Sequence, residues 1–261
     1  NAACDKPHHA PPRQSVYGSW AMGERLDIHN SETPVLCRSC EARHRGMCGV
    51  LKPDELVELA RHTHKVRHQH GDELIGDSTE IRSYANVMRG AVKLSKVLED
   101  GRQQLVGLQF APDFLGRLFG RESVLTAEAA STVDLCVIPV PALERMIATT
   151  PALEHRLMQQ TLRELDEARE WMVTLGRKTA QEKVASFLFL IAMHADPAAE
   201  VNGHIGFELP LSRSDIADFL GLTIETVSRQ LTKLRQSGTI SITNNRSVEV
   251  PDLDALQALC G

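Results

Sequence analysis

Apolar residues recur at helical spacing in the stretch from Thr150 to Gly176. Thr150 can act as an N-cap, a proline follows where helices accept one, and Gly176 can end the helix, so the pattern predicts one helix over residues 151–176. Within it, residues spaced alternately three and four apart form a seam typical of paired parallel helices. The seam consists of Met158, Thr161, Leu165, Ala168, Met172 and Leu175. We therefore predict a homodimer through this helix, the alternative being a helix that lies against its own domain.

Between about Leu56 and Val140 the pattern changes to short β-favouring runs separated by glycines. Short strands divided by turns predict a β-roll or jelly-roll. Asp100-Gly101 between two alternating segments is a strong hairpin signal. The histidines at 62, 64, 68 and 70 are interpreted as a solvated face rather than as ligands. A β-roll of this kind can bind a small effector.

The C-terminal part predicts short helices followed by a hairpin. Thr179 and Glu182 form a capping box at the start of a helix with an apolar face. Two further helices follow, with Gly221 at the turn between them, Ser212 or Ser214 as cap of the first and Thr223 as cap of the second. Residues 240–250 are typical of a β-hairpin with its turn at 244–245. This order predicts a winged helix-turn-helix.

The second of these two helices has a polar face opposite its packing face. Arginine can hydrogen bond to guanine O6 and N7, and glutamate can accept from cytosine N4. The N-terminal half of a recognition helix enters the major groove. We therefore predict that this helix contacts DNA through Glu225, Thr226, Ser228, Arg229 and Lys233. The alternative for Glu225 and Arg229 is an ordinary surface ion pair.

Length and composition limit the domain organisation. A chain of 261 residues with 42% hydrophobic content can bury two cores. We predict an α+β protein with a flexible leader over 1–34, a sensor domain over 35–150, a dimerisation helix over 151–176 and a DNA-binding domain over 177–261. The net charge of -5 excludes a global positive field. With no bilayer-length apolar run and no signal peptide pattern, the prediction is a cytoplasmic protein without membrane contact.

Three cysteines near the N-terminus have the spacing C-x2-C-x7-C: Cys37, Cys40 and Cys48. Three thiolates, which are soft ligands, within a short segment of polar and small residues are typical of a loop that binds a metal. A fourth ligand is then needed, and Cys136 is a better candidate than Cys260 because it lies in the same half of the chain. Iron-sulfur clusters characteristically take four thiolates, whereas zinc can use the same four cysteines or His44 in place of Cys136. Free thiols are the third possibility.

No catalytic acid, base or nucleophile accompanies the cysteines, so an enzyme is not expected.

These features together resemble the Crp/Fnr superfamily of bacterial transcription regulators. The order of β-roll, long helix and winged helix-turn-helix is that of the superfamily, and ETVSR over 225–229 resembles the Fnr-type recognition helix. The four cysteines are similar to those of the oxygen-sensing Fnr branch, and GRKTAQEKVASFL and LDEAREWM resemble the alphaproteobacterial FnrL and FnrN group.

The resemblance implies a mechanism. Cys37, Cys40, Cys48 and Cys136 would bind an oxygen-labile [4Fe-4S] cluster, Glu225, Ser228 and Arg229 would read a palindromic TTGAT-type site, and the homodimer would recruit RNA polymerase as an activator of anaerobic genes. Arg117 and Arg121 lack the glycine-glutamate turn of a phosphate site, so no cyclic nucleotide is expected. Some Fnr proteins carry an acidic residue where this chain has Ala168. Pairing of the helices is therefore expected to depend less on the cluster.

Overall fold

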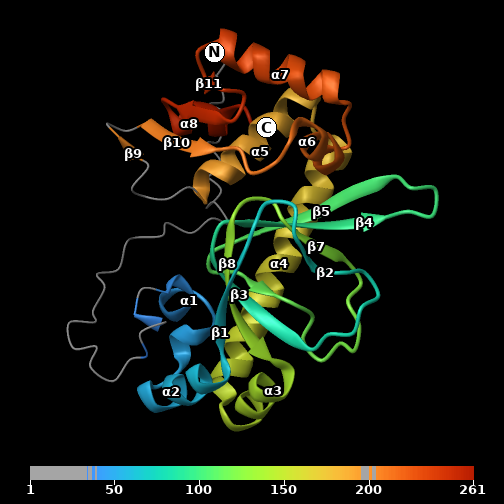
Figure 1. Ribbon diagram of the computed structural model, residues 1–261. Coiled ribbons are helices and arrows are strands. Elements are labelled where there is room, and N and C mark those ends of the chain that lie inside the picture. Colours follow the sequence, from blue (N-terminus) through green and yellow to red (C-terminus); the bar gives the residue numbers. More distant parts are fainter. Residues whose placement is uncertain (1–33, 35–36, 39, 195–199, 202–203) are drawn as a thin grey trace, which may run out of the picture. The chain divides into compact units, whose positions relative to one another are not determined.

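The computed structural model describes residues 34, 37, 38, 40–194, 200, 201 and 204–261 (Figure 1). The predicted leader therefore lies outside the described residues, except for Pro34. The described residues form helices and three four-stranded antiparallel sheets, which confirms the predicted α+β fold class.

The first two sheets pack face to face as a β-roll. One has the strand order β1-β8-β3-β6 and the other β2-β7-β4-β5. Val87 and Val133 from the first sheet and Val92 and Ala129 from the second are fully buried in the core between them. The strands are β1 (His64–His68), β2 (Glu73–Ile75), β3 (Ser83–Arg89), β4 (Ala91–Val97), β5 (Gln103–Phe110), β6 (Phe114–Leu115), β7 (Thr126–Ala129) and β8 (Val133–Pro139).

The hairpin predicted at Asp100-Gly101 is confirmed. It joins β4 to β5, and Gly101 has a φ of +84°, which a residue with a side chain adopts only at a steric cost. The backbone N–H of Leu98 donates to the Arg102 carbonyl, 2.8 Å away, and closes the turn.

Helices surround the outer face of the β1-β8-β3-β6 sheet. They are α1 (Glu41–His44), the 3-10 helix η2 (Met47–Val50), α2 (Pro53–His62) and α3 (Val140–Thr149). The prediction of strands from Leu56 onward is wrong, because Leu56 lies in α2. Pro53 opens that helix, the Glu55 carboxylate accepts from the Lys52 N–H at 2.8 Å, and Leu56 and Leu59 form its buried side.

The long helix α4 (Pro151–Arg177) is confirmed with a different end. Gly176 does not stop it, since the helix continues to Arg177 and the Lys178 N–H still bonds to the Thr174 carbonyl at 3.2 Å. Thr150 occupies the N-cap position, but its hydroxyl lies 3.4 Å from a Glu55 carboxylate oxygen and does not cap the helix.

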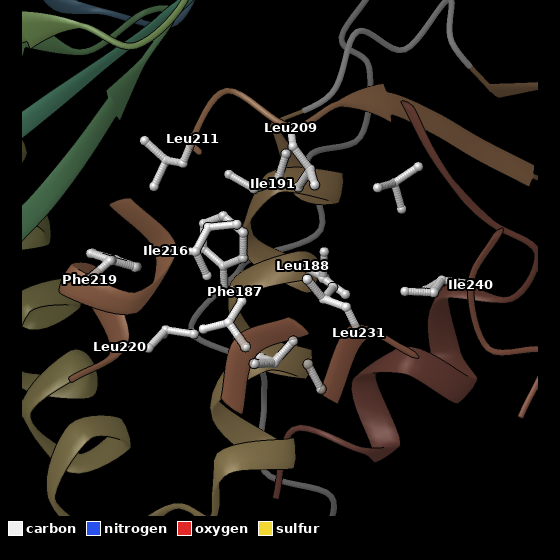
Figure 2. Packing of buried hydrophobic residues seen from close by; sticks show 14 of the residues in the cluster. Phe187, Leu188, Ile191, Leu209, Leu211, Ile216, Phe219, Leu220, Leu231 and Ile240 are labelled. Carbon is white, nitrogen blue, oxygen red and sulfur yellow. The ribbon is translucent and has the colours of Figure 1, made fainter. Parts of the chain in front are cut away.

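The C-terminal part has one core built around α5 (Ala180–Met193), as Figure 2 shows. Its start is the predicted capping box, in which Thr179 Oγ1 accepts from the Glu182 N–H. Phe187, Leu188 and Ile191 of α5 pack against Ile216, Leu220 and Leu231 (Figure 2). The other elements are β9 (Glu200–Val201), β10 (His204–Glu208), α6 (Arg213–Leu220), α7 (Ile224–Gln236), β11 (Ser241–Thr243), β12 (Ser247–Val250) and α8 (Leu253–Ala258).

The third sheet, in the order β11-β12-β10-β9, forms the predicted wing. Asn244 and Asn245 both have positive φ, so the β11–β12 turn lies where the sequence places it. Across the parts of the chain that the structure describes, no helix is both long and apolar enough to cross a bilayer.

Candidate functional site

The four predicted cysteine ligands line a single cavity, although about 90 residues separate Cys136 from the other three along the chain. Cys37 and Cys40 lie in the turns before α1, Cys48 lies in η2, and Cys136 lies in β8. In the sheet, Cys136 is paired with Asn86 of β3 on one side and Lys65 of β1 on the other. Sheet pairing therefore decides which cysteine joins the N-terminal loop.

The cavity is apolar apart from the thiols and a few polar groups. Its other lining residues are Arg43, Leu56, Leu59, Ala60, Thr63 and Asn86. Burial raises the pKa of Cys48 well above its usual value, and the charges of Cys136, Cys40 and Cys37 add to this. Burial and the Cys40 charge raise the pKa of Cys136 to about 11. This mutual influence reflects how close the thiols lie to one another.

The donor set fits a metal held by thiolates. Four sulfur ligands suit an iron-sulfur cluster or zinc, and Arg43 supplies a positive charge beside Cys37. Within the described residues, no three His, Cys, Asp or Glu side chains are already arranged as metal ligands. The four thiols therefore share one cavity, in which they would be the ligands of such a metal.

The structure separates Cys136 from the other candidates for the fourth ligand. His44 ends α1, is exposed, and does not line the cavity. Cys260 lies in the C-terminal part, where its thiol donates to the Leu256 carbonyl at 3.4 Å. Its pKa is raised by burial, and a hydrogen bond with Ser186 opposes the increase.

Asn86 is a site residue that sequence reasoning missed. Its side chain is 1% exposed, and Nδ2 donates to the Cys48 sulfur at 3.8 Å. Its Oδ1 is buried and finds no hydrogen-bond partner among the described residues. The available sequence signal was an asparagine, which strands disfavour, inside the otherwise β-favouring segment SYANVMR.

The predicted seam of α4 lies mainly on its exposed side. Met158 is 57% exposed, Leu165 43% and Met172 71%. Thr161 and Ala168 are also exposed, whereas Leu175 is half-buried. The opposite side of the helix contributes Leu153, Leu157, Gln160 and Thr174, which are buried. The helix therefore packs on its own domain with one side and keeps an apolar stripe available on the other.

The helix-turn-helix forms as the sequence predicts. Ser212, and not Ser214, caps α6, and its hydroxyl accepts from the Asp215 N–H at 3.1 Å. Gly221 ends α6 with a φ of +60°, and Thr223 caps α7 by accepting from the Thr226 N–H at 3.2 Å. Val227, Leu231 and Leu234 of α7 are buried, and Leu222 packs against the same core.

The outward face of α7 carries the predicted DNA-contacting side chains. Glu225, Ser228, Arg229 and Lys233 are exposed, and Thr226 is half-buried. Arg229 Nη2 donates to Thr226 Oγ1 at 3.4 Å. In the described part of the chain, no ion pair joins Glu225 to Arg229, and both side chains are exposed. A backbone hydrogen bond and the Thr223 hydroxyl hold the pKa of Glu225 below its usual value, which keeps it an acceptor.

Arg213 is a further residue of this surface that sequence reasoning missed. It begins α6, and its Nη2 donates to the Asn245 carbonyl in the wing turn at 3.2 Å. Its Nη1 is buried and has no hydrogen-bond partner in the part of the chain that the structure describes. The bond ties the wing to the helix-turn-helix, which sets where the exposed Arg246 lies relative to α7.

Known proteins match both parts of the chain. Residues 65–150 match the cyclic nucleotide-binding domain, and residues 182–259 match the Crp-like helix-turn-helix domain. A probable transcriptional activator of Rhizobium leguminosarum bv. viciae is 55% identical over 235 residues, covering 90% of this chain and 97% of the relative. The transcriptional activator protein FnrL of Cereibacter sphaeroides is 42% identical over 232 residues, covering 86% of this chain and 93% of the relative.

A solved structure supports the same assignment. FixK2 from Bradyrhizobium japonicum has a TM-score of 0.69 and 31% identity, covering 76% of this chain and 98% of that chain. The relatives are regulators that bind DNA and activate transcription. The chain therefore belongs to the Crp/Fnr family, where it fits the alphaproteobacterial Fnr branch, and it is a transcriptional activator and not an enzyme.

Proposed function

We propose that this activator is an oxygen-responsive regulator that holds a [4Fe-4S] cluster on Cys37, Cys40, Cys48 and Cys136. The observation that carries the proposal is the shared cavity, in which the N-terminal cysteine loop meets one cysteine of the central sheet. When bound, the cluster would supply the oxygen-labile centre. The residues of the chain supply thiolate ligands, the apolar walls of Leu56 and Leu59, and the positive charge of Arg43.

The DNA side of the proposal rests on α7. Members of the Crp/Fnr family bind DNA as dimers, and the exposed stripe of Met158, Leu165 and Met172 gives this chain a surface for pairing. Two recognition helices about 34 Å apart require a two-fold symmetric operator. We infer a TTGAT-type palindrome read by Glu225, Ser228 and Arg229, with phosphate contacts from Lys233. The regulator acts in the cytoplasm with RNA polymerase as partner, and it uses no cyclic nucleotide.

One experiment on protein purified without air tests this function. We expect visible absorption and about four iron atoms per chain, both lost on aeration together with tight binding to the palindrome. Colourless protein that contains zinc, or equal DNA affinity before and after aeration, would contradict oxygen sensing. Substituting Ser for each cysteine in turn should abolish the absorption, and full iron in the Cys136→Ser variant would exclude that residue as a ligand.

A further inference from the structure

We propose that Arg156 of α4 transmits the state of the cysteine loop to the dimerisation helix, an inference that rests on the proposed function. Its guanidinium spans two consecutive carbonyl groups of the loop. Nε donates to the Gly46 carbonyl at 3.3 Å, and Nη2 donates to the Arg45 carbonyl. Both carbonyls lie between Cys40 and Cys48, so a rearrangement of those cysteines around a metal would move them.

The same side of α4 also holds the loop by apolar contact. Met47, which directly follows Gly46, is fully buried in one cluster with Leu153 and Leu157. Leu153, Arg156 and Leu157 are spaced three and four apart, so they lie on one face of the helix. Apolar contact tolerates small rotations because it is not directional. Hydrogen bonds to carbonyls depend on angle, and Arg156 therefore senses how the loop backbone is oriented.

The positive charge of Arg156 makes its contact with the loop carbonyls important. Arg156 is half-buried, and burial together with the nearby charge of Arg163 lowers the pKa of Arg156 from its usual value. A guanidinium nevertheless stays charged. Within the described residues Arg156 forms no ion pair, and its guanidinium donates to the Gly46 and Arg45 carbonyls. If the loop rearranges and the two carbonyls move away, the Arg156 side chain must either leave its half-buried position or keep its charge there without hydrogen-bond acceptors.

Arg156 lies close to the seam in sequence but outside it. Met158 follows by two residues on the exposed side of the helix, so a shift or rotation of this first part of α4 changes how the seam of one chain meets that of its partner. Binding at the cysteines and binding at DNA are thereby coupled through one side chain. Couplings between two sites of this kind typically change affinity by about 5- to 150-fold.

The test compares Arg156→Ala with Arg169→Ala in the full chain, purified without air. Arg169 is a matched control, since it lies on the same helix, carries the same charge, and has a side chain 64% exposed that pairs only with Asp166 among the described ion pairs. Iron content and visible absorption report loading. The ratio of the affinities for the palindrome before and after aeration measures the coupling between the cysteine site and DNA binding. A general weakening of DNA binding by the lost positive charge affects both affinities equally and leaves the ratio unchanged.

We expect Arg156→Ala to keep its visible absorption while the affinity ratio falls about tenfold, and Arg169→Ala to keep the wild-type ratio. In metal-free protein, amide hydrogen exchange over residues 153–160 should be faster in Arg156→Ala. An unchanged ratio in a loaded Arg156→Ala protein would overturn the inference. If Arg156→Ala does not load, Arg156→Lys is tested instead, because lysine keeps the charge but lacks the planar fork of donors that fixes the angles to the two carbonyls. A wild-type affinity ratio in a loaded Arg156→Lys protein would also overturn the inference. If the wild-type protein contains no cluster and its DNA binding does not change in air, the proposed function itself is contradicted.

Discussion

Asn86 shows how a single side chain can set the properties of the cysteine site. Its amide donates to the Cys48 sulfur, while the other end of the amide, Oδ1, is buried and has no partner in the described chain. Burying an unsatisfied acceptor costs about 1 to 3 kcal/mol. If the proposed cluster is held by Cys48, the Asn86 amide would tune it, since hydrogen bonds to sulfur change the properties of such centres.

Replacing Asn86 by Leu should therefore separate stability from oxygen sensitivity. The free energy of unfolding of metal-free protein should stay within about 1 kcal/mol of wild type or rise, because a poorly satisfied amide is removed. The bleaching of visible absorption in air should become about tenfold faster, because the sulfur loses its hydrogen bond. Denaturant unfolding and stopped-flow absorption measure the two effects. Bleaching at the wild-type rate would show that the amide does not influence the bound metal.

Arg229 is expected to read a base and not only phosphate. Arg229→Ala should weaken binding to the palindrome by about 1 to 3 kcal/mol and relax base preference at one position of each half-site. Lys233→Ala serves as the control, because a phosphate contact should weaken binding to specific and random DNA alike and reduce the salt slope by about 1. Competition binding at several salt concentrations distinguishes these cases. Equal losses on both DNAs for Arg229→Ala would mean that it contacts phosphate alone.

At the scale of the element, α4 has two faces with different tasks. Leu153 and Leu157 are buried against the domain, whereas Met158, Leu165 and Met172 remain largely exposed. An apolar stripe on one helix face favours association, because burying a Met or Leu side chain contributes about 1.5 to 3 kcal/mol. The regular three- and four-residue spacing predicts that the stripe pairs with a second copy of the helix.

Met172→Glu should prevent pairing without unfolding the chain, because the side chain is 71% exposed in the single chain. Two lost methionine contacts, one from each copy, should weaken the dimer about 100-fold or more. Val173 is a matched control, since it is apolar and 55% exposed on the same turn but lies outside the seam. Sedimentation equilibrium should show monomer for Met172→Glu and dimer for Val173→Glu. A dimeric Met172→Glu protein would place the interface elsewhere.

At the scale of the whole molecule, the proposed regulation requires that a change at the cysteine cavity reach α7 through α4. Ala168 is important here because it puts no charge into the seam. Like charges buried between two helices would oppose pairing, and their absence makes the dimer less dependent on the cluster. On the proposed function, the cluster would then act mainly on the orientation of the helices, and the contact from Arg156 to the loop offers a route for this.

Two observations test this expectation. Metal-free wild-type protein should remain dimeric at micromolar concentration, and Ala168→Asp should be monomeric without metal and recover dimer only when loaded. Analytical ultracentrifugation with and without air measures both. A metal-free wild-type chain that runs as a monomer at that concentration would show that pairing depends on the cluster despite Ala168.

Local chemistry explains which elements could be predicted. The capping box at Thr179, the left-handed turn at Gly221, the hairpin at Gly101 and the wing turn at Asn244 each depend on neighbouring residues only. The helical period of α4 is equally local, although its end was misplaced by one residue because Gly176 tolerates the helix. The start of the β-roll was wrong because it included Leu56 and Leu59, which lie three residues apart, a spacing typical of a helix and not of a strand.

The sequence by itself determined the order of the elements, the apolar stripe of α4 and the polar face of α7, because all three follow from periodicity along one segment. Only the tertiary structure decided that Cys136, rather than His44 or Cys260, meets the N-terminal loop, since that depends on the register of β8 against β3. Asn86 and Arg156 became visible in the same way. Their partners are a sulfur and two carbonyls distant in the chain, and spacing carries no information about such contacts.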